Sequence, residues 1–304
     1  MDKSVILIFS IIGFGYFFAY KTTERNELEK GLNKYLYYIA LPFTIFLKTA
    51  GLKTEIVSLN FALINSVPIL FVYFLIYIFW KTKIFSSNFS RTLAVTSTLG
   101  NLVYLGLSVI SFTQGEEFIG TGAVIAVIQN LVIFTAGVFL LNIICDDGSC
   151  LKIFFSKIIK NPLFASSILG ILWSYFSLPV PDFLIRFLTE FSKSVTSIAL
   201  FTVGIGLYGK KITLLNINKI LIISFFKLVF LPLIVFGWIY FTGESDINYK
   251  IVFIQYTMPV AVACYVLAYE FNLEYDVVAQ SILFTTILYF FFYPFYSALI
   301  SLLF

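Results

Sequence analysis

Asn101 and Lys227 are the first residues that could bind a solute, since each is a polar side chain inside a long apolar segment. The Asn101 amide offers two N–H donors, and it stands beside a helix breaker, Gly100, with a second breaker at Pro259. Broken helix ends expose backbone N–H groups and a partial positive charge. Lys227 is the one charge near the centre of a segment, where a charge is costly and usually functional. Together these residues predict a cradle for an anion such as a carboxylate.

Each of these residues also has a structural interpretation. Asn101 could bond across helices, Lys227 could extend its side chain toward the cytoplasm, and Gly and Pro are frequent in spanning helices as ordinary kinks. Gln129 and Asn130 form a further polar pair in an apolar segment. Adjacent side chains on a helix point about 100° apart, so both need not face one cavity.

The residue inventory disfavours catalysis. The chain has no His, which removes the usual general base and the commonest metal ligand. The spans hold no pair of Asp residues for an aspartyl intramembrane protease. Cys145, Cys150 and Cys264 are expected to be free thiols, because two of them share a short loop that contains no His. We therefore expect no enzyme, no metal site and no cofactor.

The composition places these residues in a membrane. Of 304 residues, 60% are apolar and only 12% are charged, and the mean hydropathy is +0.97. Such a chain could not cover its apolar surplus with polar surface, which excludes a cytosolic enzyme, a nucleic-acid binder and a disordered chain. A spanning helix needs about 20 apolar residues. The sequence therefore predicts an all-α polytopic protein that has the lipid bilayer as a partner and no nucleic acid.

Ten apolar segments carry the expected spans. Their approximate limits are Ser4–Tyr20, Lys34–Ala50, Val57–Trp80, Leu93–Phe112, Phe118–Ile144, Pro162–Phe176, Phe183–Tyr208, Leu214–Phe241, Ile251–Tyr269 and Val277–Phe304. The odd-numbered loops between them hold about twice as many Lys and Arg residues as the opposite side. Cytoplasmic loops carry this excess, so both termini are expected outside. The loop with Glu270, Glu274 and Asp276 breaks the pattern, because it contains no basic residue.

Ten spans divide into two halves of five, and an odd number per half inverts the second half in the membrane. We expect residues 1–144 to form the first repeat, 145–161 a short cytoplasmic connector, and 162–304 the second repeat. Helix breakers fall at corresponding places, Gly100-Asn101 in the fourth span and Thr257-Met258-Pro259 in the ninth. Interrupted helices at matching positions of inverted repeats point to the binding site of a transporter.

At these residues the chain resembles the auxin efflux carrier family, also called PIN-like permeases. The motifs keep their order over nearly the whole length. They are Tyr38-Ile39-Ala40-Leu41-Pro42, Gly100-Asn101 with Gly106, Gln129, Asn161-Pro162 followed by Ser166 to Ser174, Val203-Gly204-Ile205-Gly206-Leu207, Lys227 with Pro232, Met258-Pro259, and Tyr269-Glu270-Phe271-Asn272.

The resemblance implies ten helices in two inverted five-helix repeats, similar to sodium/proton antiporters and bile-acid symporters. Spans four and nine would cross at mid-membrane, while spans one, two, six and seven would form a scaffold against which the others move. It also adds residues to the expected substrate site, which then comprises Pro42, Gly100, Asn101, Gln129, Lys227, Met258 and Pro259.

Family substrates are small organic anions, auxin in plants and dicarboxylates such as malonate or malate in bacteria. The resemblance therefore implies a secondary transporter of a carboxylate in the plasma or inner membrane. Gly100 stands where plant members have Pro, and the connector is short, so auxin itself is not the expected substrate. An ion-coupled antiporter or symporter of the same architecture is the alternative, although neither break has an Asp or Glu beside it. A purely structural or sensory membrane protein also stays open, as does a homodimer.

The charge bias gives a first prediction, that both termini face away from the cytoplasm. A reporter that is active only in the cytoplasm, fused after Phe304, should be silent, because the odd-numbered loops carry the positive charges. Bright cytoplasmic signal from this fusion would reverse the predicted topology.

Overall fold

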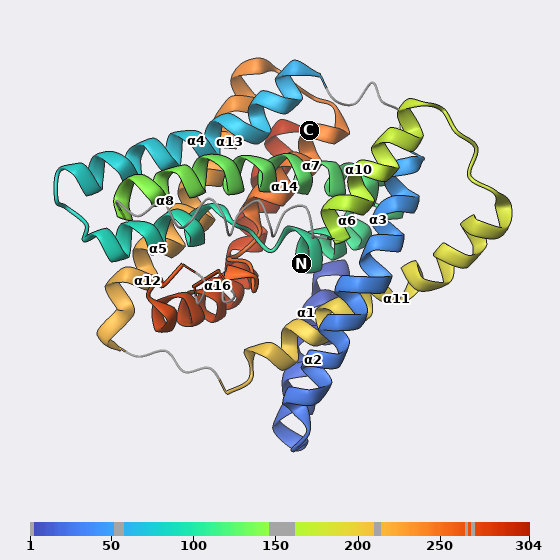
Figure 1. Cartoon of the computed structure of the whole chain (residues 1–304), viewed down its shortest axis with the longest axis horizontal. Coiled ribbons are helices and arrows are strands. Elements are labelled where there is room, and N and C mark those ends of the chain that lie inside the picture. The colour runs from blue at the N-terminus through green and yellow to red at the C-terminus, as the bar shows by residue number, and fades with distance from the viewer. Residues whose placement is uncertain (1–2, 52–57, 146–161, 210–213, 265–266, 269–270) are drawn as a thin grey trace. The chain divides into compact units, whose positions relative to one another are not determined.

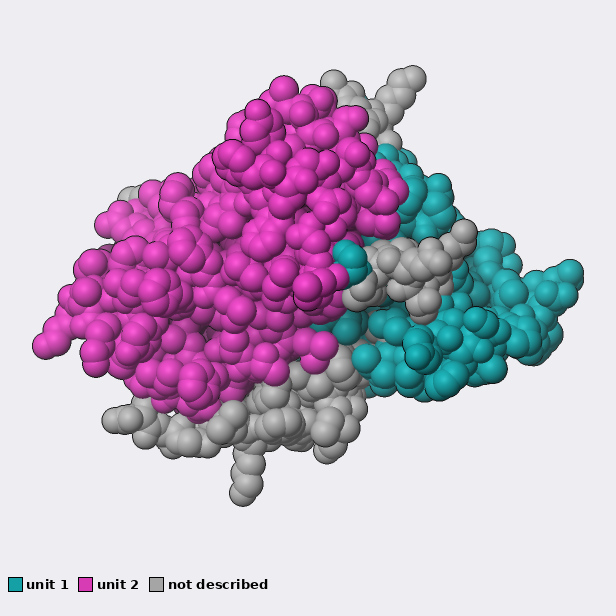
Figure 2. All heavy atoms as spheres, turned by 90° about the horizontal axis from the view of Figure 1, so that it is seen from above, with its two compact units in different colours: residues 1–58, 102–127, 158–209 teal, residues 59–101, 128–157, 210–304 magenta. Residues whose placement is uncertain are grey.

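The structure, a computed structural model, describes residues 3–51, 58–145, 162–209, 214–264, 267–268 and 271–304. Within these ranges every regular element is helical, and the only paired extended backbone is an isolated bridge between Gly100 and Val260. Figure 1 labels these helices along the chain. The chain divides into two compact units (Figure 2). Unit 1 comprises Met1–Ser58, Leu102–Val127 and Ile158–Gly209; unit 2 comprises Leu59–Asn101, Ile128–Lys157 and Lys210–Phe304.

Unit 1 is built on two pairs of helices that pack along each other, α1 with α11 and α10 with α3. Helix α2 runs into α3 through a π-helical turn, and α6 packs against both α1 and α11. The bounds are α1 Lys3–Lys21, α2 Arg25–Tyr35, the π turn Leu36–Ala40, α3 Leu41–Ala50, α6 Leu107–Thr113, α10 Pro162–Tyr175 and α11 Asp182–Leu207.

Two glycines set the close approach of α1 and α11. A side-chain carbon placed on Gly15 would overlap the carbonyl oxygen of Phe201, and one placed on Gly204 would overlap the carbonyl oxygen of Ile12. Small residues let the backbones of membrane helices come together in this way. The glycine of the predicted Val203–Leu207 motif thus has a packing role.

Unit 2 surrounds the two predicted breaks. Helix α4 packs against α5 and α13, α13 packs against α14, and α12 packs against α16. The bounds are α4 Leu59–Lys81, α5 Ser87–Thr98, α8 Val138–Cys145, α12 Ile217–Phe225, a π turn Phe226–Phe230, α13 Leu231–Thr242, α14 Ile247–Thr257 and α16 Tyr275–Leu303. Helix α7 (Ile119–Val132) begins in unit 1 and ends in unit 2.

Each of the ten predicted segments contains helix in the described residues. Four helical stretches are long and apolar enough to cross a membrane, namely Leu59–Lys81, Glu116–Ile144, Ile217–Thr242 and Tyr275–Leu303. Two shorter apolar helices cover Ile6–Lys21 and Leu102–Thr113. The chain is thus an all-helical protein with apolar spans, while the total of ten spans and the inverted repeat stay predictions.

Several helices begin earlier than their apolar runs. Helix α5 starts at Ser87 instead of Leu93, because the Ser86 hydroxyl accepts a hydrogen bond from the Phe89 N–H at 3.3 Å. Helix α14 starts at Ile247 instead of Ile251, because the Asp246 carboxylate accepts from the Asn248 N–H at 2.6 Å. Capping side chains extend a helix beyond the segment that hydropathy marks.

Tyrosines compensate for two prolines inside the helices of unit 2. Proline has no N–H to donate to the carbonyl four residues earlier. For Pro68 that carbonyl belongs to Ile64, and it accepts from the Tyr256 hydroxyl at 3.0 Å. For Pro232 it belongs to Leu228, and it accepts from the Tyr296 hydroxyl at 2.6 Å. These prolines are therefore points where other helices attach.

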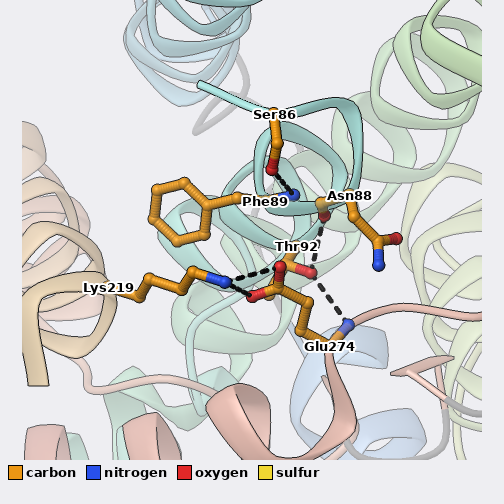
Figure 3. A network of polar contacts seen from close by, with 6 residues as sticks. All are labelled: Ser86, Asn88, Phe89, Thr92, Lys219 and Glu274. Carbon is orange, nitrogen blue, oxygen red and sulfur yellow. Dashed lines mark hydrogen bonds and ion pairs between the residues drawn. The ribbon is translucent and has the colours of Figure 1, made fainter. Parts of the chain in front are cut away.

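A cluster of polar groups joins three odd-numbered loops at one end of unit 2 (Figure 3). The Lys219 ammonium contacts both carboxylate oxygens of Glu274 at 2.8 Å. The Glu274 N–H donates to the Thr92 hydroxyl at 3.0 Å, and that hydroxyl donates to the Asn88 carbonyl at 2.9 Å. Arg91 donates to the Phe271 carbonyl. The acidic loop therefore has a basic partner, Lys219 in the first turn of α12. Glu270 lies outside the described residues.

A second cluster joins α4, α13 and α14 through Asn60. Its amide donates to the Glu244 carboxylate at 2.6 Å and to the Tyr249 hydroxyl at 3.2 Å, and its oxygen accepts from the Trp238 indole at 3.2 Å. All of these residues lie at or near even-numbered loops. Polar contacts thus hold unit 2 at the ends of its helices.

The packing units cut across the predicted repeats, since each unit takes helices from both halves of the chain. Spans one, two, six and seven fall in unit 1, as the scaffold grouping implies. Residues 102–127 also fall in unit 1, although the resemblance assigned them to the moving part, because α6 packs on α1 and α11. The boundaries 1–144, 145–161 and 162–304 stay predictions.

The α1–α11 contact predicts a strong effect of one methyl group. Gly204→Ala should destabilise the protein by about 1–3 kcal/mol, because the added carbon has no room beside the Ile12 carbonyl. Gly13→Ala is the matched control on α1, since nothing lies within 4 Å of its added carbon. Thermal unfolding in detergent compares the two, and an unchanged Gly204→Ala midpoint would contradict the packing.

Candidate functional site at two paired helix breaks

Helices α5 and α14 both stop in the middle of apolar sequence. Helix α5 ends at Thr98, and Leu99 is extended with φ −76° and ψ 98°. Helix α14 ends at Thr257, and Met258 has φ −60° and ψ 139°. The residue before a proline is pushed out of helical geometry, so Pro259 accounts for the second break. Gly100 weakens the helix at the first break.

The two breaks pair with each other as a short antiparallel bridge between Gly100 and Val260. The Asn101 N–H donates to the Pro259 carbonyl at 2.8 Å, and the Ala261 N–H donates to the Leu99 carbonyl at 3.0 Å. In hydrocarbon, backbone groups freed from a helix must find partners within the protein. The two breaks thus meet through Leu99 to Asn101 and Pro259 to Ala261, while a mid-membrane crossing and a substrate site at Gly100, Asn101, Met258 and Pro259 stay predictions.

Two residues that the sequence did not single out support this bridge. The Val260 N–H donates to the Thr285 hydroxyl of α16 at 3.2 Å, and that hydroxyl donates to the Ser281 carbonyl at 2.7 Å. The buried Cys264 thiol lies 3.9 Å from the Leu99 carbonyl and 4.0 Å from the Val95 carbonyl. The four-residue spacing of Ser281 and Thr285 was the available sequence signal, because it places two hydroxyls on one face of an apolar helix.

The Asn101 side chain is buried at this bridge without a hydrogen bond in the described part of the chain. Only 4% of the residue is exposed. Its backbone N–H is used by the bridge, while its carboxamide keeps its donors and its acceptor unused. Ser97 and Ser281 of the same unit also have hydroxyls without a partner in the described chain, so what distinguishes Asn101 is its place on the bridge. The structural interpretation, a bond across helices, has no support from the contacts observed.

Gln129 instead takes part in a buried amide pair within unit 2. Its Nε2 donates to the Asn65 Oδ1 at 3.0 Å, and the Asn65 Nδ2 donates to the Phe61 carbonyl at 2.8 Å. The pair connects α7 to α4, which is an interhelical contact of the type expected in membranes. A part for Gln129 in substrate binding stays a prediction.

Lys227 lies in the π turn between α12 and α13, with 1% of its surface exposed. It is the one charged side chain that is buried in the described residues. Among those residues it forms no hydrogen bond or ion pair, and the Cys264 thiol is near enough to interact with it electrostatically. The alternative interpretation required the side chain to extend to the cytoplasmic end of the helix. Its burial shows that it does not.

Pro42 is the remaining predicted site residue. It is buried in the first turn of α3, directly after the π turn Leu36–Ala40. Pro42 belongs to unit 1, whereas the other six residues belong to unit 2. Its membership of the site stays a prediction.

Comparison with known proteins agrees with a membrane carrier. The family described as membrane transport protein matches residues 2–145 and 148–297. The chain belongs to this family, that of the auxin efflux carriers. It is also 25% identical, over 299 residues and 93% of both chains, to a protein of Methanocaldococcus jannaschii described as an uncharacterized transporter. The auxin efflux carrier resemblance is thus confirmed, and the chain is a membrane transporter.

The support of the bridge by α16 predicts a stability difference between two adjacent threonines. Thr285→Val should destabilise the protein by about 1–3 kcal/mol, because the buried Val260 N–H loses its acceptor. In Thr286→Val the lost hydroxyl donated only to the Ile282 carbonyl of its own helix, so a much smaller change is expected. Equal midpoints of thermal unfolding for both variants would show that Thr285 does not hold the bridge.

Proposed function

We propose that this carrier moves a small organic anion, a carboxylate, across the cytoplasmic membrane by alternating access. The observation that carries the proposal is the buried Asn101 carboxamide, which has no partner among the described residues and sits on the paired breaks. A carboxylate accepts hydrogen bonds and donates none, so the amide N–H groups of Asn101 match it.

The distribution of buried charge favours an anion over a cation. In the described chain the buried charged residue is a lysine, and no Asp or Glu is buried there. No group of three His, Cys, Asp or Glu residues that could hold a metal ion occurs in this part either. A transported cation would need carboxylate or other oxygen ligands. These features support transport of an anion over transport of a cation, and they leave open the ion-coupled antiporter or symporter as a means of driving it.

Alternating access needs two bodies that can move against each other, and the chain has two compact units. In the sequence, the border between unit 2 and unit 1 runs through the first break, between Asn101 and Leu102. A second border runs through α7, between Val127 and Ile128. In this proposal, unit 2 carries the binding residues and moves as one body, because its ends are held by the Lys219–Glu274 and Asn60 clusters.

Asn101→Ala tests the site. The variant should bind malate or malonate roughly ten- to hundredfold more weakly, since a lost hydrogen bond to a charged group is worth about 1.5–3 kcal/mol. Asn101→Asp should bind more weakly still, because it places a like charge beside the anion. The measurements are equilibrium binding in detergent and initial uptake into proteoliposomes.

The control for this experiment is Asn88→Ala, which removes an exposed amide from the first turn of α5. It should bind and transport like the parent protein. If both Asn101 variants bind carboxylates with parental affinity, the site is not at the paired breaks. If the parent protein binds no member of a carboxylate panel, anion transport itself is contradicted.

A further inference from the structure

Lys227 is placed where a proton could be coupled to the transported anion. The residue is buried in the π turn Phe226–Phe230, which packs against α5, α12, α13 and α16. No carboxylate in the described part of the chain pairs with its ammonium. Removing a charge from water without a counter-charge is costly, and no described residue offsets this cost by pairing with Lys227.

The titratable groups on the surrounding elements do not supply a counter-charge. On α12, Lys219 is paired with Glu274, and on α5, Arg91 donates to the Phe271 carbonyl. Helix α13 carries the exposed Tyr240. Helix α4 carries Tyr77 and Tyr73, and the Tyr73 hydroxyl is hydrogen-bonded to Thr98. Helix α16 contributes Asp276 in its first turn and Tyr275, Tyr289, Tyr293 and Tyr296, of which Tyr296 donates to Leu228. Tyr265, Tyr269 and Glu270 lie outside the described residues.

Cys264 connects this lysine with the paired breaks. Its thiol interacts electrostatically with Lys227, and it also lies 3.9 Å from the Leu99 carbonyl. That carbonyl accepts the Ala261 N–H of the bridge. The π turn that bears Lys227 also packs against α5, the helix that ends at this bridge, and the C-terminal end of a helix favours a positive charge.

A carboxylate bound at the bridge would provide the missing counter-charge. The attraction between an ammonium and a carboxylate is strong away from water. An anion at Asn101 then makes the protonated amine of Lys227 more favourable, and the protonated amine makes anion binding more favourable, because linkage between two sites is reciprocal.

We propose that Lys227 takes up a proton from water when the carboxylate binds and returns it to water when the carboxylate leaves, so that one proton travels with each anion. The amine nitrogen gains an N–H bond on binding and loses it on release, and no other bond changes. A singly charged anion would then be carried without net charge. This inference rests on the proposed function of the paired breaks.

Proton uptake on binding is the direct measurement. The purified full-length protein is mixed with malonate in weakly buffered solution near neutral pH, and the pH change and the bound malonate are recorded together. About one proton should be taken up per malonate bound. Calorimetry in two buffers with different heats of ionisation should give the same number.

Lys227→Arg separates charge from proton exchange, because the guanidinium stays charged. The variant should bind malonate but take up no proton, and its uptake into proteoliposomes should not respond to an imposed pH gradient. Lys227→Gln should bind malonate at least tenfold more weakly, also without proton uptake. Lys193→Gln is the control: it removes an exposed lysine that is paired with Glu190, and proton uptake should persist.

Malonate binding by the parent protein without proton uptake would overturn the coupling while leaving the proposed function intact. Full binding and transport by Lys227→Gln would also overturn it and would make Lys227 structural. The parent protein tests the inference even if a variant does not fold, because net malonate uptake should accelerate when the outside is made more acidic than the inside.

Discussion

The constraint on which unit 2 depends is that backbone groups in hydrocarbon must find partners inside the protein. Gly100 and Pro259 each end a helix within the apolar part of the chain and so leave N–H and carbonyl groups without helical partners. The structure pairs the two defects with each other, and Thr285 accepts the N–H of Val260 that this pairing leaves over. A single break would leave backbone groups without partners, whereas two paired breaks satisfy each other's N–H and carbonyl groups.

The same constraint explains where tyrosine occurs in this unit. Pro68 and Pro232 leave the carbonyls of Ile64 and Leu228 without their usual donors, and the hydroxyls of Tyr256 and Tyr296 replace those donors. Each repair attaches one span to another. The irregular positions of these helices are thus the places where the spans of unit 2 attach to one another.

Charge in unit 2 is arranged by depth. At the helix ends, the Lys219–Glu274 pair and the Asn60 cluster are hydrogen-bonded to residues of neighbouring helices and loops. In the interior, Asn101 and Lys227 have polar atoms that no described residue satisfies. Ser97 and Asn142 of the same unit also have buried polar atoms without partners among the described residues. Asn101 is therefore singled out by its place on the paired breaks and Lys227 by its buried charge, and anion binding and proton uptake are proposed on those grounds.

The sequence by itself determined the membrane class, the family, the position of several apolar helices and the two breaks, because run length, proline geometry and glycine propensity act locally. It also indicated Asn101 and Lys227, since a polar residue within an apolar run is visible without coordinates. Only the tertiary structure decided which groups meet. Gln129, a predicted site residue, pairs with Asn65. Glu274, whose own loop contains no basic residue, binds Lys219. Thr285, which the sequence did not single out, and Cys264, which it marked only as a free thiol, lie against the bridge. These outcomes depend on contacts between residues far apart in the chain, which no local pattern records.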